Sequence, residues 1–325
     1  MRESILTQPI LGIHHVTAIA GDPQRNLDFY TEVLGLRLVK LTVNFDDPGT
    51  YHFYFGNGTG VPGTILTFFP YPGAYKGRRG AGQADAVAFA VPKGSLGFWA
   101  SYLKEHDLEV EGPSPRFSQP VLAFADPDGL RLELVEVEVS LAEPWLSGPI
   151  PAEHAIRGFF GVTLAERDRE KTAAVLVDVM GYQAVGHEGG RYRYQGGQDA
   201  PGAVVDILEQ PNAPHSIVAG GSVHHVAFRT PNDSEQLEWR EALLAHGLDV
   251  TPMKDRIYFH SIYFHEPGGV LFEIATDAPG FLVDESEAEL GSELRLPPWL
   301  EPQRPNIERV TQPLRLSQAV VRSES

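Results

Sequence analysis

HHVT at residues 14–17 and HHVA at residues 224–227 lie 210 positions apart in a chain of 325 residues. In both places an apolar run follows the histidines, and then a Pro-containing breaker and an amphipathic stretch. The same offset of 210 aligns Leu27 with Leu237. A strand followed by a helix has therefore been duplicated, with imidazoles retained at one strand position in each copy. Two imidazoles that an internal repeat brings together indicate a metal site between the copies.

A second internal match supplies a carboxylate. Residues 124–136 and 264–276 each contain an acid-Pro-x-Gly turn between apolar runs, and an offset of 140 aligns Glu133 with Glu273. Such a turn is typical of a tight connection between strands. Glu273 has apolar neighbours on both sides, and a carboxylate in such a strand is costly unless it is paired or bound to a cation. Glu273 is therefore the third candidate ligand.

The chain divides into four modules that repeat one order of elements. Each reads as a strand, a helix and then two or three strands, and Gly- or Pro-rich linkers separate some of them. The modules cover about residues 11–70, 84–137, 156–210 and 222–276. We predict an α+β protein of βαβββ modules, with an N-terminal domain at 1–150, a C-terminal domain at 151–280 and a tail at 281–325. The tail either wraps the domain or mediates assembly.

Bulk composition excludes several classes of protein. The formal net charge of −17 argues against a nucleic-acid partner, which needs a basic face. No apolar run approaches the roughly 18 residues of a membrane span, and no secretory leader pattern opens the chain. Cysteine is absent, which excludes thiolate metal ligands and fits a reducing compartment. We therefore expect a cytoplasmic globular protein.

The repeated modules resemble the vicinal-oxygen-chelate superfamily, which includes glyoxalase I, bleomycin-resistance proteins and type I extradiol dioxygenases. In that family two modules close into an open barrel around a metal. The closer resemblance is to the ring-cleaving dioxygenases that act on hydroquinones. The stretches that carry it are IHHVT at 13–17, YHFYF at 51–55, VPKGSL at 91–96, VHHVAF at 223–228 and PGGVLFE at 267–273.

The resemblance implies roles for eight residues. The metal ligands of that group match His15, His225 and Glu273. Further residues that the group keeps near its site match His14, His224, Thr17, Arg256 and Tyr263. Strand alternation would place His15 and Thr17 on one face and His14 on the other. We therefore expect one ligand from each histidine pair, with His14 and His224 supporting the ligands from behind.

Some of these residues also have plainer interpretations. Tyr263 either handles a proton and orients substrate or is simply a strand aromatic. Arg256 either anchors an anionic substrate oxygen or is a solvated charge. His52 and His260 line the pocket or lie in the core or at the surface, and Glu133 is a surface or salt-bridged residue.

The ligand types themselves indicate a reaction. Two imidazoles and one carboxylate leave about three coordination positions open, as in non-haem Fe(II) oxygenases. An aromatic diol can fill one or two of them and dioxygen the next. We therefore predict an extradiol-type dioxygenase that uses Fe(II), or else Mn(II), to open a hydroquinone or a related dihydroxylated ring. Its partners would be that aromatic diol, dioxygen and further copies of the chain.

Two other functions are alternatives for this sequence. A glyoxalase-like lyase or isomerase generally uses a fourth, acidic ligand, and the last strand of the first module, TILTFF at 64–69, has no Glu. A metal-free aromatic-ligand or drug-binding protein would not need the ligand set. In modules two and three, Asp85-Ala86 and the FFG run at 159–161 replace the histidine pairs. We predict that modules one and four share the metal cleft and that modules two and three form a metal-free counterpart.

Overall fold

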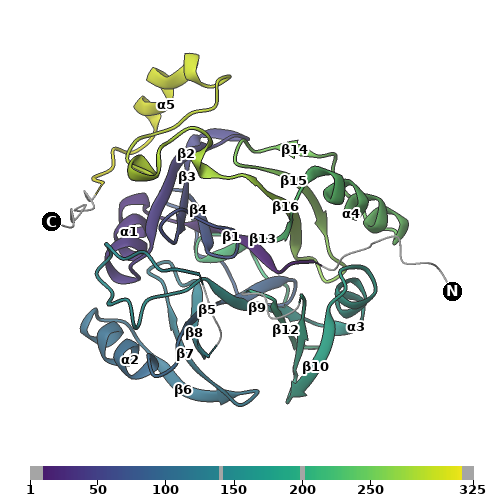
Figure 1. Cartoon of the computed structure of the whole chain (residues 1–325). Helices are drawn as coiled ribbons and strands as arrows, with labels where there is room; N and C mark the ends of the chain where they lie inside the picture. The colour runs from purple at the N-terminus through teal and green to yellow at the C-terminus, as the bar shows by residue number, and fades with distance from the viewer. Residues whose placement is uncertain (1–9, 139–141, 198–201, 317–325) are drawn as a thin grey trace.

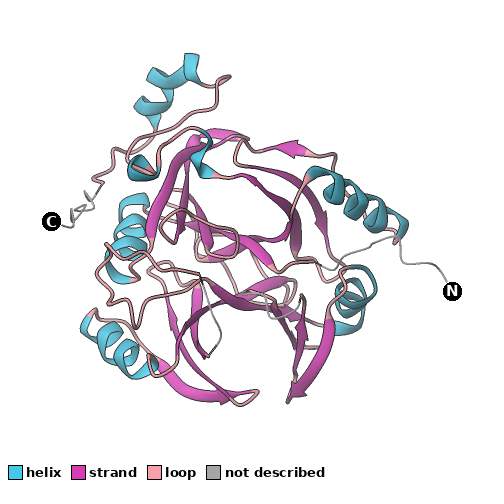
Figure 2. Cartoon of the chain, in the orientation of Figure 1, coloured by secondary structure: helices cyan, strands magenta, loops and turns pink. Residues whose placement is uncertain are grey.

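Two curled β-sheets of eight strands each make up the molecule, and the helices lie at its periphery (Figures 1 and 2). The computed structural model describes residues 10–138, 142–197 and 202–316. Each module contributes four strands and one main helix, so the predicted α+β architecture of βαβββ modules is confirmed. In the described part of the chain, no helix is long and apolar enough to cross a membrane.

The elements follow the predicted module boundaries closely. Module one holds β1 (Ile13–Ala20), α1 (Pro23–Asp28), β2 (Arg37–Asn44), β3 (Asp47–Gly56) and β4 (Ile65–Pro70). Module two holds β5 (Gln83–Pro92), α2 (Leu96–Glu105), β6 (Glu111–Arg116), β7 (Gln119–Ala125) and β8 (Arg131–Val137). Module three holds β9 (Phe159–Glu166), α3 (Arg169–Ala174), β10 (Gln183–Glu188), β11 (Arg191–Gln195) and β12 (Val204–Glu209). Module four holds β13 (Ser222–Thr230), α4 (Asp233–Ala245), β14 (Lys254–Asp255), β15 (Phe259–His265) and β16 (Leu271–Pro279).

Local sequence explains where the first helix begins and ends. The Asp22 side chain accepts a hydrogen bond from the Arg25 amide, and Pro23 occupies the first turn, where a missing N–H costs nothing. A π-helical turn, Phe29–Val33, continues the helix. Gly35 then adopts a φ of +70°, which is favourable for glycine and ends the helix. Module three repeats the π-helical turn at Val175–Val179, which is a further trace of the duplication.

The two sheets pair the outer modules and the inner modules. One sheet has the order β14-β15-β16-β13-β1-β4-β3-β2, and the other has the order β10-β11-β12-β9-β5-β8-β7-β6. At their centres β1 lies antiparallel to β13, and β5 lies antiparallel to β9. Modules one and four therefore form one half-barrel, which we call the first sheet, and modules two and three form the second sheet. Each sheet draws on both sides of residue 150, and the division into domains at 1–150 and 151–280 stays a prediction.

The tail after β16 wraps the outside of the first sheet (Figure 1). Its short helices are Phe281–Val283, Glu287–Glu289, Glu301–Gln303 and α5 (Arg304–Val310). The Arg295 amide donates to the Leu41 carbonyl on edge strand β2. Buried Lys40 of the same strand forms ion pairs with Asp284 and Glu285 of the tail. The described part of the tail thus covers a sheet edge, while residues 317–325 lie outside the described residues.

Candidate metal centre

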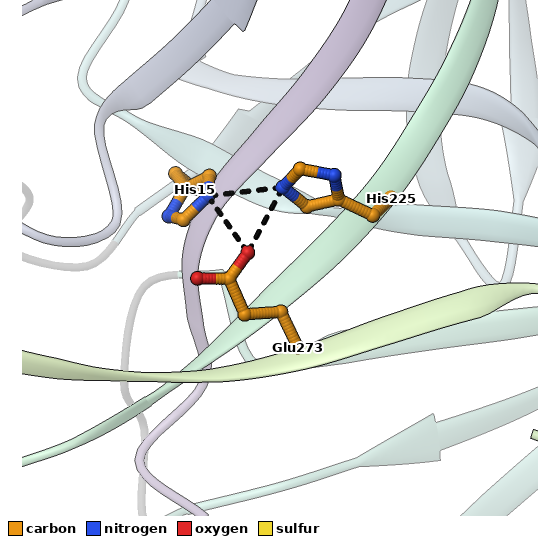
Figure 3. Close-up of side chains that lie close together, drawn as sticks. All are labelled: His15, His225 and Glu273. Carbon is orange, nitrogen blue, oxygen red and sulfur yellow. Dashed lines mark hydrogen bonds and ion pairs between the residues drawn. The ribbon is translucent and has the colours of Figure 1, made fainter. Parts of the chain in front are cut away.

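Three buried side chains from three strands converge in the first sheet (Figure 3). His15 of β1, His225 of β13 and Glu273 of β16 have exposed fractions of 2%, 5% and 0%. His225 Nε2 lies 2.9 Å from Glu273 Oε2, and His15 Nε2 lies 3.3 Å from the same oxygen. The two Nε2 atoms are 3.3 Å apart. Residues separated by 210 and 48 positions therefore meet at one point, as the repeat predicted.

Two β-bulges set the direction of the histidines. The β1–β13 register passes from Ile13↔Phe228 to His15↔Ala227, so β1 carries His14 as an extra residue. It passes from Thr17↔His225 to Ala18↔Val223, so β13 carries His224 in the same way. The expectation that strand alternation turns His14 to the opposite face is therefore wrong, because a bulge interrupts the alternation. Both histidines of each pair instead lie beside one another.

Each first histidine supports its neighbour by a ring-to-ring contact. His14 Nδ1 lies 2.9 Å from His15 Nδ1, and His224 Nδ1 lies 2.8 Å from His225 Nδ1. One nitrogen of each contact must carry the proton and the other must accept it. When the inner ring donates through Nδ1, its Nε2 lone pair faces the centre, which is the tautomer that metal ligation requires.

The Ser261 hydroxyl orients Glu273, and sequence reasoning missed this residue. Ser261 Oγ donates to Glu273 Oε1 at 2.5 Å, which leaves Oε2 to face the two imidazoles. Burial raises the pKa of Glu273, but the electrostatic influence of the nearby His15 and His225 rings outweighs burial and holds the pKa well below its usual range. The sequence did contain a signal for Ser261. Side chains alternate between the two faces of a strand, and Ser261 is two residues from Tyr263 on β15, so both face the same side.

The geometry of the three atoms fits a shared cation. Glu273 Oε2 is buried and makes no hydrogen bond of acceptable geometry, although two imidazole nitrogens lie close to it. Ligand atoms about 2.0–2.2 Å from one ion at right angles lie roughly 3 Å apart, as these three do. Burial lowers the pKa of His225, which favours the neutral imidazole that a metal needs. His15, His225 and Glu273 could therefore hold a metal ion.

A cavity of about 460 Å³ opens beside the three side chains. Tyr263 pairs with Glu273 across the β15–β16 ladder, as predicted, and its ring meets His225 edge-on at a centroid distance of 5.8 Å. Arg256 Nε donates to the Tyr263 hydroxyl at 3.2 Å, and Arg256 Nη2 donates to Asp46 at 3.0 Å. Asp46 lies in the β2–β3 turn and was missed because that turn is remote in sequence. The Arg256–Asp46 ion pair joins the two edge regions of the first sheet across the cavity mouth.

The remaining candidate residues are three histidines and Thr17. His224 and His52 line the cavity, whereas His260 lies outside it and contacts Asp233 through Nδ1 at 2.6 Å. Thr17 is fully buried, and its hydroxyl accepts a hydrogen bond from Thr67 at 2.8 Å. Burial lowers the pKa of His224 to about 4, and the charge of His225 acts in the same direction.

The register also shows what stands where a fourth ligand would be. Glu273 pairs with Ala227 in module four, and Ala227 matches Thr17 at the repeat offset of 210. Thr17 pairs with Thr67 in module one. Thr67 therefore occupies the position equivalent to Glu273, and it offers a hydroxyl in place of a carboxylate.

The second sheet has carboxylates at both equivalent positions and arginines beside them. Glu133 pairs with Ala88, and Asp206 pairs with Thr163. Glu133 accepts two hydrogen bonds from Arg116 at 2.5 and 2.9 Å, and Asp206 accepts two from Arg193 at 2.8 and 3.0 Å. Glu133 is thus salt-bridged as expected, although it is buried and not at the surface. Within residues 10–138, 142–197 and 202–316, the cluster in the first sheet is the only group suited to a metal.

Comparisons with known proteins agree with this architecture. Residues 12–134 and 158–274 match the Glyoxalase/Bleomycin resistance protein/Dioxygenase superfamily. The "Putative ring-cleaving dioxygenase MhqO" of Bacillus subtilis is 47% identical over 304 residues, which cover 94% of this chain and 96% of the relative. The "Chlorohydroquinone/hydroquinone 1,2-dioxygenase" of Sphingobium indicum is 37% identical over 303 residues, which cover 91% and 94%.

Solved structures show the same fold. A "putative dioxygenase" from Bacillus subtilis superposes with a TM-score of 0.92 at 46% identity, over 95% of this chain and 99% of that one. Glyoxalase I from Zea mays superposes with a TM-score of 0.62 at 17% identity, over 82% and 92%, and shares the fold alone. The predicted resemblance to hydroquinone-type ring-cleaving dioxygenases is confirmed by these relatives. The chain therefore belongs to the glyoxalase/bleomycin resistance protein/dioxygenase superfamily.

Proposed function

We propose that this protein is a ring-cleaving dioxygenase that acts on a hydroquinone or a related dihydroxylated aromatic ring. His15, His225 and Glu273 would hold Fe(II), and the aromatic diol and dioxygen would be its substrates. The observation that carries the proposal is the buried Glu273 oxygen, which faces two imidazole nitrogens at 2.9 and 3.3 Å without a hydrogen bond. The names of the relatives at 47% and 37% identity support the reaction type.

Iron held there supplies the redox chemistry that lets an aromatic diol react with dioxygen. The chain's own residues do the positioning. Phe69 and Phe259 line the cavity and exclude water from the face of a bound ring. Asp46 and Tyr263 hold the Arg256 guanidinium at the mouth, where it can also bind an oxygen that gains negative charge.

Tyr263 and His224 are the proposed proton-handling groups. The Tyr263 oxygen already accepts from Arg256, so its own hydrogen is free to be donated to a substrate oxygen. Burial, followed by the charge of Glu273, raises the pKa of Tyr263, which keeps it a phenol at neutral pH. His224 lines the cavity, and its Nδ1 accepts the hydrogen of His225 Nδ1, so the neutral His224 ring carries its own proton on Nε2 and can donate it to a substrate oxygen. His14 and Thr17 would support the ligands from behind the cavity.

Several finer points belong to the same proposal. We propose extradiol-type cleavage, with Mn(II) as the alternative ion, in a cytoplasmic homo-oligomer. A glyoxalase-like reaction is disfavoured, because Thr67 stands where a fourth acidic ligand would be. A metal-free binding protein is disfavoured, because the three potential ligands converge.

Anaerobic reconstitution with Fe(II) tests the proposal directly. Oxygen uptake is then measured on a panel of hydroquinones and catechols, with Zn(II)-loaded protein as the redox-inactive control. We expect uptake of one dioxygen per ring opened with iron and none with zinc. Absence of uptake with every diol would contradict the proposed reaction, and turnover of a thiohemiacetal instead would favour the glyoxalase-like alternative.

A further inference from the structure

His52 and Tyr54 form a polar patch on the cavity wall to which the proposed reaction gives no role. Both lie on β3 and line the cavity, because residues two apart share a face of a strand. The intervening Phe53 belongs to the hydrophobic core on the other face. Tyr54 is almost completely buried, whereas His52 is half-buried.

A chain of hydrogen bonds runs from this patch toward the base of the metal centre. Tyr54 OH lies 2.9 Å from His52 Nδ1, and His52 Nε2 lies 2.9 Å from Thr67 Oγ1. The Thr67 hydroxyl donates onward to Thr17 at 2.8 Å. The Thr67 oxygen therefore accepts from His52 Nε2–H, which leaves Nδ1 as the acceptor for the Tyr54 hydrogen.

When the hydrogen bonds run in this direction, one acceptor position stays free, and it lies on the Tyr54 oxygen. The Tyr54 oxygen gives its hydrogen to His52, so it can still accept a hydrogen bond from a molecule in the cavity. Burial lowers the pKa of His52 and raises that of Tyr54, so both groups stay neutral. The acceptor is therefore present across the neutral pH range.

Aromatic side chains lie close both to the patch and to the three potential ligands. Phe259 packs against His15 at a centroid distance of 4.9 Å and against Tyr54 at 6.4 Å. Phe69 packs against His52 at 4.3 Å and against His224 at 5.7 Å. The apolar rings of Phe69 and Phe259 thus border the cavity. The ligand cluster and the Tyr54 hydroxyl are two distinct polar sites beside these rings.

We propose that Tyr54, held by His52, binds the substrate hydroxyl that does not face His15, His225 and Glu273. This inference rests on the proposed function and specifies its substrate class. The two hydroxyls of a 1,4-diol point away from opposite ends of the ring, whereas those of a 1,2-diol are adjacent and can both face the ligand cluster. The Tyr54 subsite therefore selects 1,4-diols, with Tyr54 as the specificity determinant and His52 as a positioning residue.

Calorimetric titration tests the subsite without turnover. Hydroquinone and phenol are titrated anaerobically into the purified protein, with and without Zn(II). The two probes differ by one hydroxyl, so the ratio of their affinities reports on the subsite alone. In Tyr54→Phe we expect hydroquinone affinity to fall about five- to tenfold, the effect of losing one neutral hydrogen bond, while phenol affinity stays unchanged.

Tyr51→Phe is the matched control. Tyr51 lies on the same strand, but its hydroxyl donates to the Gln312 carbonyl in the tail, away from the cavity wall. This variant should keep the wild-type ratio of affinities. The subsite is refuted if wild-type protein does not prefer hydroquinone to phenol, or if Tyr54→Phe keeps the wild-type ratio.

Variants of His52 separate positioning from simple packing. His52→Phe keeps a ring but removes the acceptor, so we expect the affinity ratio to fall as in Tyr54→Phe, with no further fall in the double variant. His52→Asn returns a side-chain oxygen near the place of Nδ1 and should restore part of the ratio. Independent effects that multiply in the double variant would overturn the positioning role. Oxygen uptake with iron tests the reaction separately, so the subsite can fail while the dioxygenase proposal stands.

Discussion

The two sheets share one topology, but they balance buried charge in different ways. In the first sheet the ion-pair partners of Glu273 among the described residues are two imidazoles, His15 and His225. In the second sheet the equivalent Glu133 is paired with Arg116 and Arg131, which carry permanent charges. A buried carboxylate needs a compensating cation. The second sheet contains its cations as side chains, whereas in the first sheet the proposed metal ion would take that role.

The sheets also differ in the room around the central strands. Ala86 and Gly161 occupy the places that correspond to His225 and His15. A Cβ atom at Gly161 would lie 2.2 Å from the Val204 carbonyl oxygen, so no imidazole fits there. The duplicated scaffold has thus kept the register of its central strand pair in both halves, whereas the side chains at the two histidine positions differ.

Removing one imidazole should produce the largest effect. His225→Ala leaves two ligands, and we expect iron binding and oxygen uptake to be lost together. Iron content after reconstitution, measured by atomic absorption, checks this. His265→Ala, a change of an exposed histidine on β15 of the same sheet, is the matched control and should retain iron. Full iron occupancy in His225→Ala would remove this residue from the ligand set.

Removing the Tyr263 hydroxyl should affect turnover but not metal binding. We expect Tyr263→Phe to lower turnover by roughly 10- to 1000-fold, near the range for loss of one acid/base group. Iron content should stay at the wild-type level, because Tyr263 contacts the His225 ring edge and is not among the three converging residues. Wild-type turnover with unchanged iron would reduce Tyr263 to a packing residue.

Neutralising the carboxylate of the second sheet should affect stability but not metal binding. Glu133→Gln leaves the partly buried Arg116 without its anion, and we expect a loss of about 1–3 kcal/mol in the free energy of unfolding. Urea denaturation measures the loss, and iron content should not change. The control is Glu138→Gln, which breaks an exposed ion pair with Lys93 and should cost less. Loss of iron in Glu133→Gln would contradict the separation of the two sheets.

A buried carboxyl pair where the sheets meet should make the stability of the fold depend on pH. Glu166 at the end of β9 packs against Gly268 in the β15–β16 turn, and burial, with the charge of Glu266, raises the pKa of Glu166 to about 8. Between its ordinary value of 4.5 and about 8, the folded state holds a proton that the unfolded chain has released. Stability should therefore fall as pH rises through this window, by at most about 1.4 kcal/mol per pH unit.

Glu166→Gln should flatten that slope. Thermal unfolding at a series of pH values measures it, and Glu170→Gln, an exposed change in the following helix, should leave the slope as in the wild type. A wild-type slope that persists in Glu166→Gln would assign the pH dependence to other groups.

The sequence by itself determined the module plan and the converging cluster. The histidine pairs recur at one offset and the acid-Pro-x-Gly turns at another. These two matches assign each residue to a strand or a helix of the repeated module. The order of strand, helix and strand follows from short-range sequence patterns. The absence of histidine at Ala86 and around Phe160 was enough to assign modules two and three to a sheet without a metal cluster. Such assignments succeed because side-chain periodicity and turn chemistry are local properties.

Only the tertiary structure decided how these residues contact one another. The bulges at His14 and His224 depend on the register between β1 and β13, which pair residues about 210 positions apart. Ser261, Asp46 and Thr67 reach the site through strands and turns that pair across the fold. A hydrogen-bond partner is specified by position in space. A chain pattern with a period of two residues indicates which face of a strand a residue occupies, but it does not reveal bulges or shifts by an even number of residues.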